Sequence, residues 1–253
     1  MSKVRLFLVA VMVMAFVAGA GIFGFSAKAE EAFTIDQITY EMDGASIRIG
    51  ESDGLNGLRF TAKLTKEDYA LINANVGDGK TYSNIEYGIL IAPADYASKV
   101  PLTKATVFGV GGDKIYDWAV LEDNAWVYHG DNKLPQLGGT GVRIINIYSN
   151  EWIEGTDAKG EEAYIYSGAI VNILDGAHGG NNNLAREMYS TAYIKATKAD
   201  GTIEYKFAPN YKSMSATFVA QKTIEMGVLT QEQNNWLQAN YIDKAVGLKT
   251  CSY

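Results

Sequence analysis

The segment GASIRIGESDGLNGLRFTAKL, residues 44–64, contains two strand patterns separated by a glycine-rich turn. Along 58–64, apolar and polar side chains alternate, which is the period of two expected of a strand with one buried face. Gly54 and Gly57 let the backbone reverse between this arm and the shorter arm at 46–49. The segment therefore predicts a β-hairpin that packs one face against a core.

Strand patterns continue along the chain. The apolar run at 85–92 is predicted to be a strand buried on both faces that ends at Pro93, because proline cannot donate to the ladder. Other strands are predicted at 142–148, 164–174 and 203–207. The pattern at 184–197 is ambiguous, but most of it is predicted to be strand, because 198–202 looks like a hairpin turn that leads into 203–207. The weaker patterns predict a strand or extended lead-in at 33–40, a strand at 105–110 and a loop at 175–183.

Helix signals occur once near the start of the chain and twice at its end. Thr65 is followed three residues later by Asp68, which is close to a capping box and predicts a short helix after Thr65. Residues 215–226 show apolar residues at helical spacing, and Gly227 fits a C-cap. A capping box at 230–233 then opens a second helix.

This order of elements predicts a mainly β fold, antiparallel and β-sandwich-like, closed by a C-terminal helical pair at about 215–246. The alternative label is α+β. No low-complexity linker interrupts residues 30–253, so we expect them to form one domain.

The N-terminus has the three parts of a secretory signal peptide. Lys3 and Arg5 form a basic region, an uncharged apolar run follows at 6–25, and Ala-Lys-Ala at 27–29 fits a cleavage site. We therefore predict a signal peptide at 1–29 and a secreted or cell-surface protein. The apolar run is long enough to cross a bilayer if it is not cut, so a membrane tether is the alternative.

The charge and the cysteine content narrow the choice of partners. The formal net charge of −7 becomes −10 when residues 1–29, with three cations and no acid, are removed. This acidic balance makes nucleic acid and anionic lipid poor partners. Cys251 is the single cysteine, so the chain forms no internal disulfide and the core must supply the stability.

Five segments together resemble a module of exported and cell-surface proteins of anaerobic Gram-positive bacteria. They are GASIR at 44–48, GLRF at 57–60, EYGILIAP at 86–93, SGAIVNI at 167–173 and REMYSTAYIK at 186–195. The likeness spans roughly residues 40–245, and the stretch 109–140 departs from the pattern. The resemblance implies work at the cell surface, but the family has no activity that it would lend to this chain.

Three arginines are candidate ligand-binding residues: Arg48, Arg59 and Arg186. Arginine offers a planar fork of donors that matches carboxylate and sulfate groups, so one interpretation is a basic pocket for an anionic ligand. The structural alternative is that these side chains pair with acids such as Glu86 or Glu187 on a sheet face.

Aromatic residues form the second candidate group. Trp118, Trp126 and Tyr128 lie in a poorly patterned region and are predicted to form a surface platform on which sugar rings stack. The alternative is that they fill a core, as we expect for Trp236 on its helical pattern. The acidic, tyrosine-rich composition is consistent with an exported protein that binds glycans.

Acidic, glycine-rich turns raise the question of calcium. They lie at 51–54, 78–79, 113, 131–132 and 175–176. Calcium takes oxygen ligands from such turns, although Asp-Gly is also common turn chemistry. We predict no cofactor and leave a weak structural calcium site open.

Catalysis has little support in the sequence. The chain has two histidines, His129 and His178, and no HExxH, GxSxG or GxxxxGK[ST] motif. We therefore predict no catalytic residues and a non-catalytic exported module that binds a glycan or another cell-surface molecule. One alternative is a structural surface subunit that self-assembles. A second is a small hydrolase with two facing carboxyl groups.

Overall fold

The hairpin predicted at 44–64 belongs to a four-stranded antiparallel sheet. Strand β1 (Tyr40–Arg48) pairs with β2 (Gly57–Thr65), β2 pairs with β9 (Glu162–Val171), and β9 pairs with β8 (Ile153–Thr156). We call this the first sheet. The computed structural model describes residues 32–49, 56–109, 118–122, 125–129, 141–149, 152–171, 173 and 183–245, and Phe33–Tyr253 forms one compact unit.

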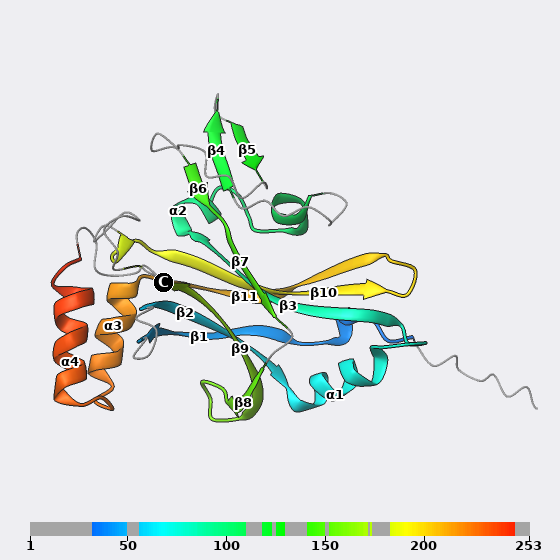
Figure 1. Ribbon diagram of the computed structural model, residues 1–253, viewed down its shortest axis with the longest axis horizontal. Coiled ribbons are helices and arrows are strands. Elements are labelled where there is room, and N and C mark those ends of the chain that lie inside the picture. The colour runs from blue at the N-terminus through cyan, green and yellow to red at the C-terminus, as the bar shows by residue number, and fades with distance from the viewer. Residues whose placement is uncertain are drawn as a thin grey trace, which may run out of the picture. The chain divides into compact units, whose positions relative to one another are not determined.

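A second four-stranded sheet lies against the first (Figure 1). Its order is β11 (Ile203–Met214), β10 (Met188–Lys198), β3 (Tyr82–Pro93) and β7 (Ile145–Ser149), all antiparallel. A small third sheet contains β5 (Ala125–His129), β4 (Trp118–Glu122) and β6 (Gly141–Arg143). The predicted fold class, an antiparallel and β-sandwich-like fold with C-terminal helices, is confirmed.

The main core fills the space between the first and second sheets. Phe60 and Leu64 of β2 face Ile89 and Ile194 of the second sheet, and all four are fully buried. Gly168 of β9 allows the sheets to approach closely, because a Cβ added there would lie only 3.2 Å from the side chains of the opposite sheet. Burial of this apolar surface is the main force that stabilises the sandwich.

Asn210 of β11 links the second sheet to β1 of the first sheet. The pairing of β10 with β11 shifts between Thr191 and Tyr193, which leaves residues 208–210 as a bulge in β11. From this bulge Asn210 accepts a hydrogen bond from the Met42 N–H at 2.8 Å and donates one to the Met42 carbonyl at 2.9 Å. The Asn210 side chain thus bonds to the main-chain N–H and carbonyl of Met42 at the edge of β1, as a neighbouring strand would.

A second, smaller core covers the outer face of the second sheet. Helix α2 (Ala94–Ala97) and the π-helical turn η2 (Lys104–Phe108) fold back over β3 and β10. Tyr96 and Phe108 from this segment pack with Tyr193 of β10. This cover leaves part of the outer face open near the end of β11.

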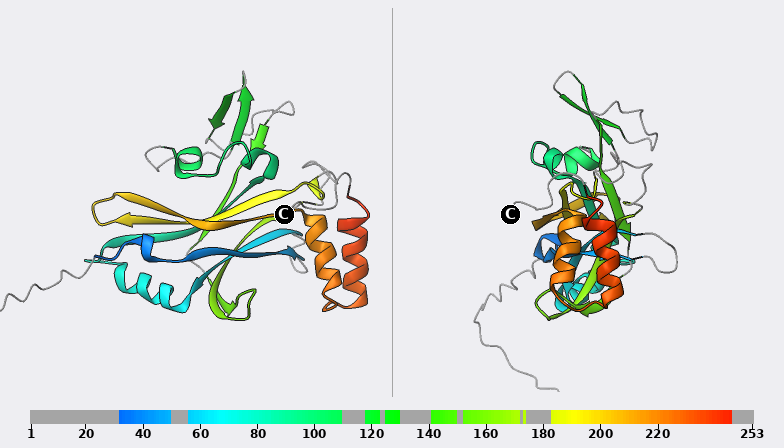
Figure 2. Two further views of the ribbon diagram at one scale, coloured as in Figure 1. Left: turned by 180° about the vertical axis from the view of Figure 1, so that it is seen from behind. Right: turned by 90° about the vertical axis from the view of Figure 1, so that its left-hand side faces the viewer.

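The helices agree with the capping signals. Helix α1 (Lys66–Asn75) begins after Thr65, whose hydroxyl accepts the Asp68 N–H at 3.0 Å. Helices α3 (Ala216–Glu225) and α4 (Gln231–Leu237) form the predicted C-terminal pair, and a π-helical turn, η5 (Gln238–Ile242), follows. Figure 2 shows α3 and α4 side by side at one end of the two sheets. Gly227 has a φ of 67°, as its C-cap position requires.

Three local predictions were wrong. Residues 35–37 form a 3₁₀ turn, because Thr34 and Gln37 bond reciprocally, and β1 begins only at Tyr40. The strand predicted at 105–110 is the π-helical turn, which Thr103 caps. The strand predicted at 142–148 is divided at Ile144 between β6 and β7, which belong to different sheets.

Several other predictions lie outside the described residues. They concern the signal peptide at 1–29, nearly all of the loop at 175–183, His178, Cys251 and the acidic turns at 51–54, 113, 131–132 and 175–176. Within the part of the chain that is described, none of the helices has the length and apolar character needed to cross a membrane.

Candidate ligand-binding groove

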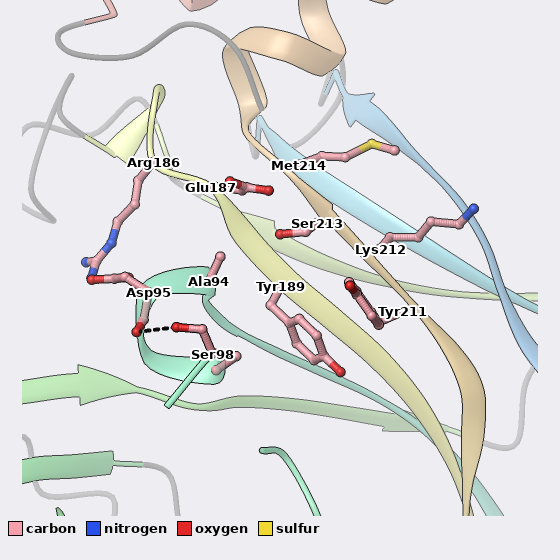
Figure 3. A pocket seen from close by; sticks show the side chains of 11 residues that line it. Ala94, Asp95, Ser98, Arg186, Glu187, Tyr189, Tyr211, Lys212, Ser213 and Met214 are labelled. Carbon is pink, nitrogen blue, oxygen red and sulfur yellow. Dashed lines mark hydrogen bonds and ion pairs between the residues drawn. The ribbon is translucent and has the colours of Figure 1, made fainter. Parts of the chain in front are cut away.

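An open groove lies between helix α2 and the adjoining ends of β10 and β11. It has a volume of about 980 Å³, in the range of sites that hold small ligands. One side comes from α2 and Ser98, and the other side comes from Arg186, Glu187, Tyr189 and residues 211–214. Figure 3 shows these side chains around the opening.

Two stacked tyrosines line the groove. The ring centroids of Tyr189 and Tyr211 lie 4.9 Å apart with an interplanar angle of 26°. Tyr189 is half-buried, and burial together with the neighbouring Tyr211 raises its pKa. Tyr211 is 60% exposed. This tyrosine pair therefore has a supported inner ring and an outer ring that is open to solvent.

The strand register brings the tyrosine pair together. Tyr189 is opposite Ser213 and Thr191 is opposite Tyr211, so the two tyrosines are diagonal neighbours on one face. That face is the outer one, since the intervening Ser190 is fully buried on the other side. The tyrosine pair therefore lies beside α2 and outside the main core.

An ion pair joins the two sides of the groove. One terminal nitrogen of Arg186 lies 3.1 Å from Oδ1 and 3.2 Å from Oδ2 of Asp95. Figure 3 shows the guanidinium group turned toward Asp95. Next to it, Ser98 donates a hydrogen bond from its hydroxyl to the Asp95 carbonyl at 3.0 Å. The main chain also joins the two walls, because the Ala94 N–H donates to the Glu187 carbonyl at 2.9 Å.

The three arginines predicted as one basic pocket lie in different places. Arg48 and Arg59 are diagonal neighbours on the outer face of the first sheet, where Arg59 is opposite Ser46. Arg186 precedes β10, which belongs to the second sheet, so the strand pairing does not place it beside Arg48 and Arg59. Its acidic partner is Asp95, whereas Glu86 pairs with Lys195 at 2.7 Å.

The predicted aromatic platform lies in the small third sheet. Trp118 is in β4, and Trp126 and Tyr128 are in β5. Their backbone register is described, with Trp118 opposite His129 and Leu121 opposite Trp126. Their side chains lie outside the described part of the structure, so the platform stays a prediction. Trp236 packs against the main core, as its helical spacing predicted.

The described residues offer no group of three histidine, cysteine or acidic side chains that would hold a metal ion. Their acids with a shifted pKa all have a lowered pKa. Asp157 is the clearest case, since a hydrogen bond from Lys63 and the N–H groups of Glu161 and Lys159 lower its pKa to about 2. The other acids with a lowered pKa are Glu162, Asp200, Glu204 and Glu225.

Sequence reasoning missed Tyr189, Tyr211 and Asp95 as neighbours. One available signal was the spacing of two residues between Tyr189 and Thr191 and between Tyr211 and Ser213. In a strand, residues two positions apart lie on the same face. Pro209 was a second signal, because proline within a strand marks an edge or a bulge. Neither signal indicates that α2 folds back beside this face.

Comparison of the chain with protein-family models, curated proteins and solved structures gives no match. The resemblance to an exported cell-surface module therefore stays a prediction. The function therefore has to be inferred from the groove itself, which contains a stacked pair of tyrosines and an ion pair between Arg186 and Asp95.

Proposed function

We propose that this chain is a non-catalytic exported module that binds a glycan of the cell surface in the groove. The observation that carries the proposal is the tyrosine pair, in which Tyr211 is 60% exposed and is supported from behind by Tyr189. An aromatic face carries partial negative charge, which attracts the C–H groups on the face of a sugar ring. The polar groups across the groove then meet the sugar hydroxyls.

The groove also has the balance of groups that a sugar needs. A sugar hydroxyl both donates and accepts hydrogen bonds, so its site must offer donors and acceptors together. Arg186 contributes N–H donors, and Asp95 and Ser98 contribute oxygen acceptors. These groups and the tyrosine pair line one opening, which suits a ring that stacks on one side and bonds at its edge.

The two alternatives have weaker support. Self-assembly through strand edges is disfavoured at β1, whose edge Asn210 occupies, and at β8, which has four residues and includes Glu154. A hydrolase needs a carboxyl group that donates a proton, and hence a raised pKa. In the described part of the chain the shifted carboxyl groups all have lowered pKa values.

The test is binding of the purified protein to insoluble polysaccharides and to a glycan array. We expect Tyr211→Ala to weaken binding by about tenfold or more, because the variant removes the stacking surface. Tyr148→Ala is the matched control, since Tyr148 is 53% exposed on β7 and does not line the groove. Failure of the protein to bind any glycan would contradict the proposal, and so would equal losses in the two variants.

A further inference from the structure

We propose that the groove selects uncharged glycans over anionic ones, because its arginine is already neutralised by its own aspartate. This inference rests on the proposed function and specifies the class of ligand. It also departs from the basic pocket for carboxylate or sulfate that the sequence suggested.

The charges that face the groove are the first step of the argument. Asp95 and Arg186 form the ion pair, and Glu187 adds a second carboxylate to the lining. Lys212 is also among the residues that line the groove, but it follows Tyr211 in β11, so its side chain belongs to the opposite face of the strand. Figure 3 shows its side chain extending away from the tyrosine pair. The charges next to the tyrosine pair therefore sum to a negative value.

The ion pair would oppose an anionic ligand. Arg186 holds both carboxylate oxygens of Asp95 through one nitrogen, at 3.1 and 3.2 Å. A uronate or sulfate would have to compete with Asp95 for this guanidinium group, and it would meet the charges of Asp95 and Glu187. The negative net charge of the chain adds a long-range repulsion toward an acidic polymer.

The same ion pair suits an uncharged, hydroxyl-rich ligand. The side chains of Arg186 and Asp95 remain 41% and 69% exposed, so both have donor and acceptor positions open to the groove. Sugar hydroxyls can bond to these positions without separating the two charges. Hydrogen bonds to charged groups are stronger than those between neutral groups, so the intact pair favours a neutral sugar.

The experiment compares oligosaccharides that differ only in charge. The probes are cellohexaose, mannohexaose and galactohexaose, each with its 6-carboxylate counterpart, titrated into the purified protein at low salt. We expect wild-type protein to bind each neutral sugar that it retains at least about tenfold more tightly than the corresponding uronate.

The decisive variant is Asp95→Asn, which frees the cation of Arg186. We expect it to raise the affinity for the uronate by about fivefold or more, and high salt should abolish the gain by screening. Glu187→Gln is a second variant. We expect it also to raise the affinity for the uronate, because it removes a carboxylate from the groove and leaves the Arg186–Asp95 ion pair intact. Glu225→Gln is the control, since it removes the acid of another exposed ion pair, Lys222–Glu225, outside the groove.

The outcomes separate this inference from the proposed function. Wild-type protein that binds uronates as tightly as neutral sugars would overturn the selectivity and leave glycan binding in place. The same conclusion follows if neither Asp95→Asn nor Glu187→Gln improves uronate binding. If neither kind of glycan binds, or if the groove binds a protein instead, the proposed function fails and this inference fails with it.

Discussion

Gly88 lies in the middle of β3, where a glycine normally weakens a strand. Its partner across the ladder is Tyr193, whose ring lies over the position that a side chain at Gly88 would occupy. The Tyr193 hydroxyl continues across the strand and donates to Asn146 of β7 at 2.8 Å. Gly88 therefore leaves space for the Tyr193 ring to cross β3, so that Tyr193 connects β10, β3 and β7.

A Gly88→Ala variant tests this role. The added Cβ would lie 2.0 Å from Cζ of Tyr193, so the ring must move and the bond to Asn146 must break. We expect a loss of about 1–3 kcal/mol in the free energy of unfolding, measured by urea denaturation. Gly155→Ala is the control, because its Cβ would meet its nearest neighbour at 3.8 Å. Equal denaturation midpoints for the two variants would contradict the argument.

At the level of single residues, strand alternation was readable from the sequence. The alternation at 58–64 correctly placed Phe60 and Leu64 in the core and Arg59 on the outer face. The partners of the charged residues were not readable. Arg186 and Asp95 are 91 positions apart, and they meet only because α2 returns to the start of β10.

The helical pair is joined to the sheets through Thr217 of α3. Its hydroxyl lies 2.9 Å from the Leu184 carbonyl and 2.9 Å from the Tyr241 carbonyl. Its main-chain N–H also donates to Leu184, at 3.0 Å. Thr217 is fully buried, so this one residue connects α3 to the turn after α4 and to the segment before β10.

Replacement of Thr217 by valine keeps the shape of the side chain and removes the hydroxyl. We expect the free energy of unfolding to fall by about 1–2 kcal/mol, because the Tyr241 carbonyl loses the Thr217 hydroxyl as a donor, whereas the Leu184 carbonyl keeps the Thr217 N–H. Thr223→Val in the same helix is the matched control, because that hydroxyl donates only to Val219 one turn earlier, at 2.8 Å. A larger loss in the control, measured in parallel thermal and urea unfolding, would count against this role for Thr217.

Elements with strong local signals were predicted well. The cap at Thr65, the capping box at 230–233 and the apolar run at 85–92 each correspond to an observed element. The segment 104–108 shows the limit of such signals. Its apolar residues Val107 and Phe108 fit a strand, but they reach the second core as a π-helical turn because Thr103 caps the segment.

Asn210 connects the two sheets where β11 passes β1. Met42 is 2% exposed, and both its N–H and its carbonyl are satisfied by the Asn210 side chain. Unpaired backbone groups at such a buried position are costly. The bulge therefore places Asn210 where it can satisfy both groups.

An Asn210→Leu variant should loosen this side of the molecule. Leucine fills similar space but leaves two buried groups of Met42 without partners, so we expect a loss of about 2–3 kcal/mol in the free energy of unfolding. The measurement is urea unfolding followed by two probes, fluorescence and far-UV circular dichroism. Asn84→Leu serves as the control, because Asn84 is exposed on β3. An Asn210 variant as stable as the control would show that the contact is dispensable.

The sequence by itself determined the class of fold, because local alternation and capping directly report which face of each element is apolar. It also determined the acidic balance and the absence of an internal disulfide, which are properties of composition. Only the tertiary structure determined which residues come together in the groove. Tyr189 and Tyr211 meet through the register of β10 with β11, and Asp95 reaches Arg186 through the return of α2. Contacts between segments far apart in the chain depend on long-range packing, on which local periodicity carries no information.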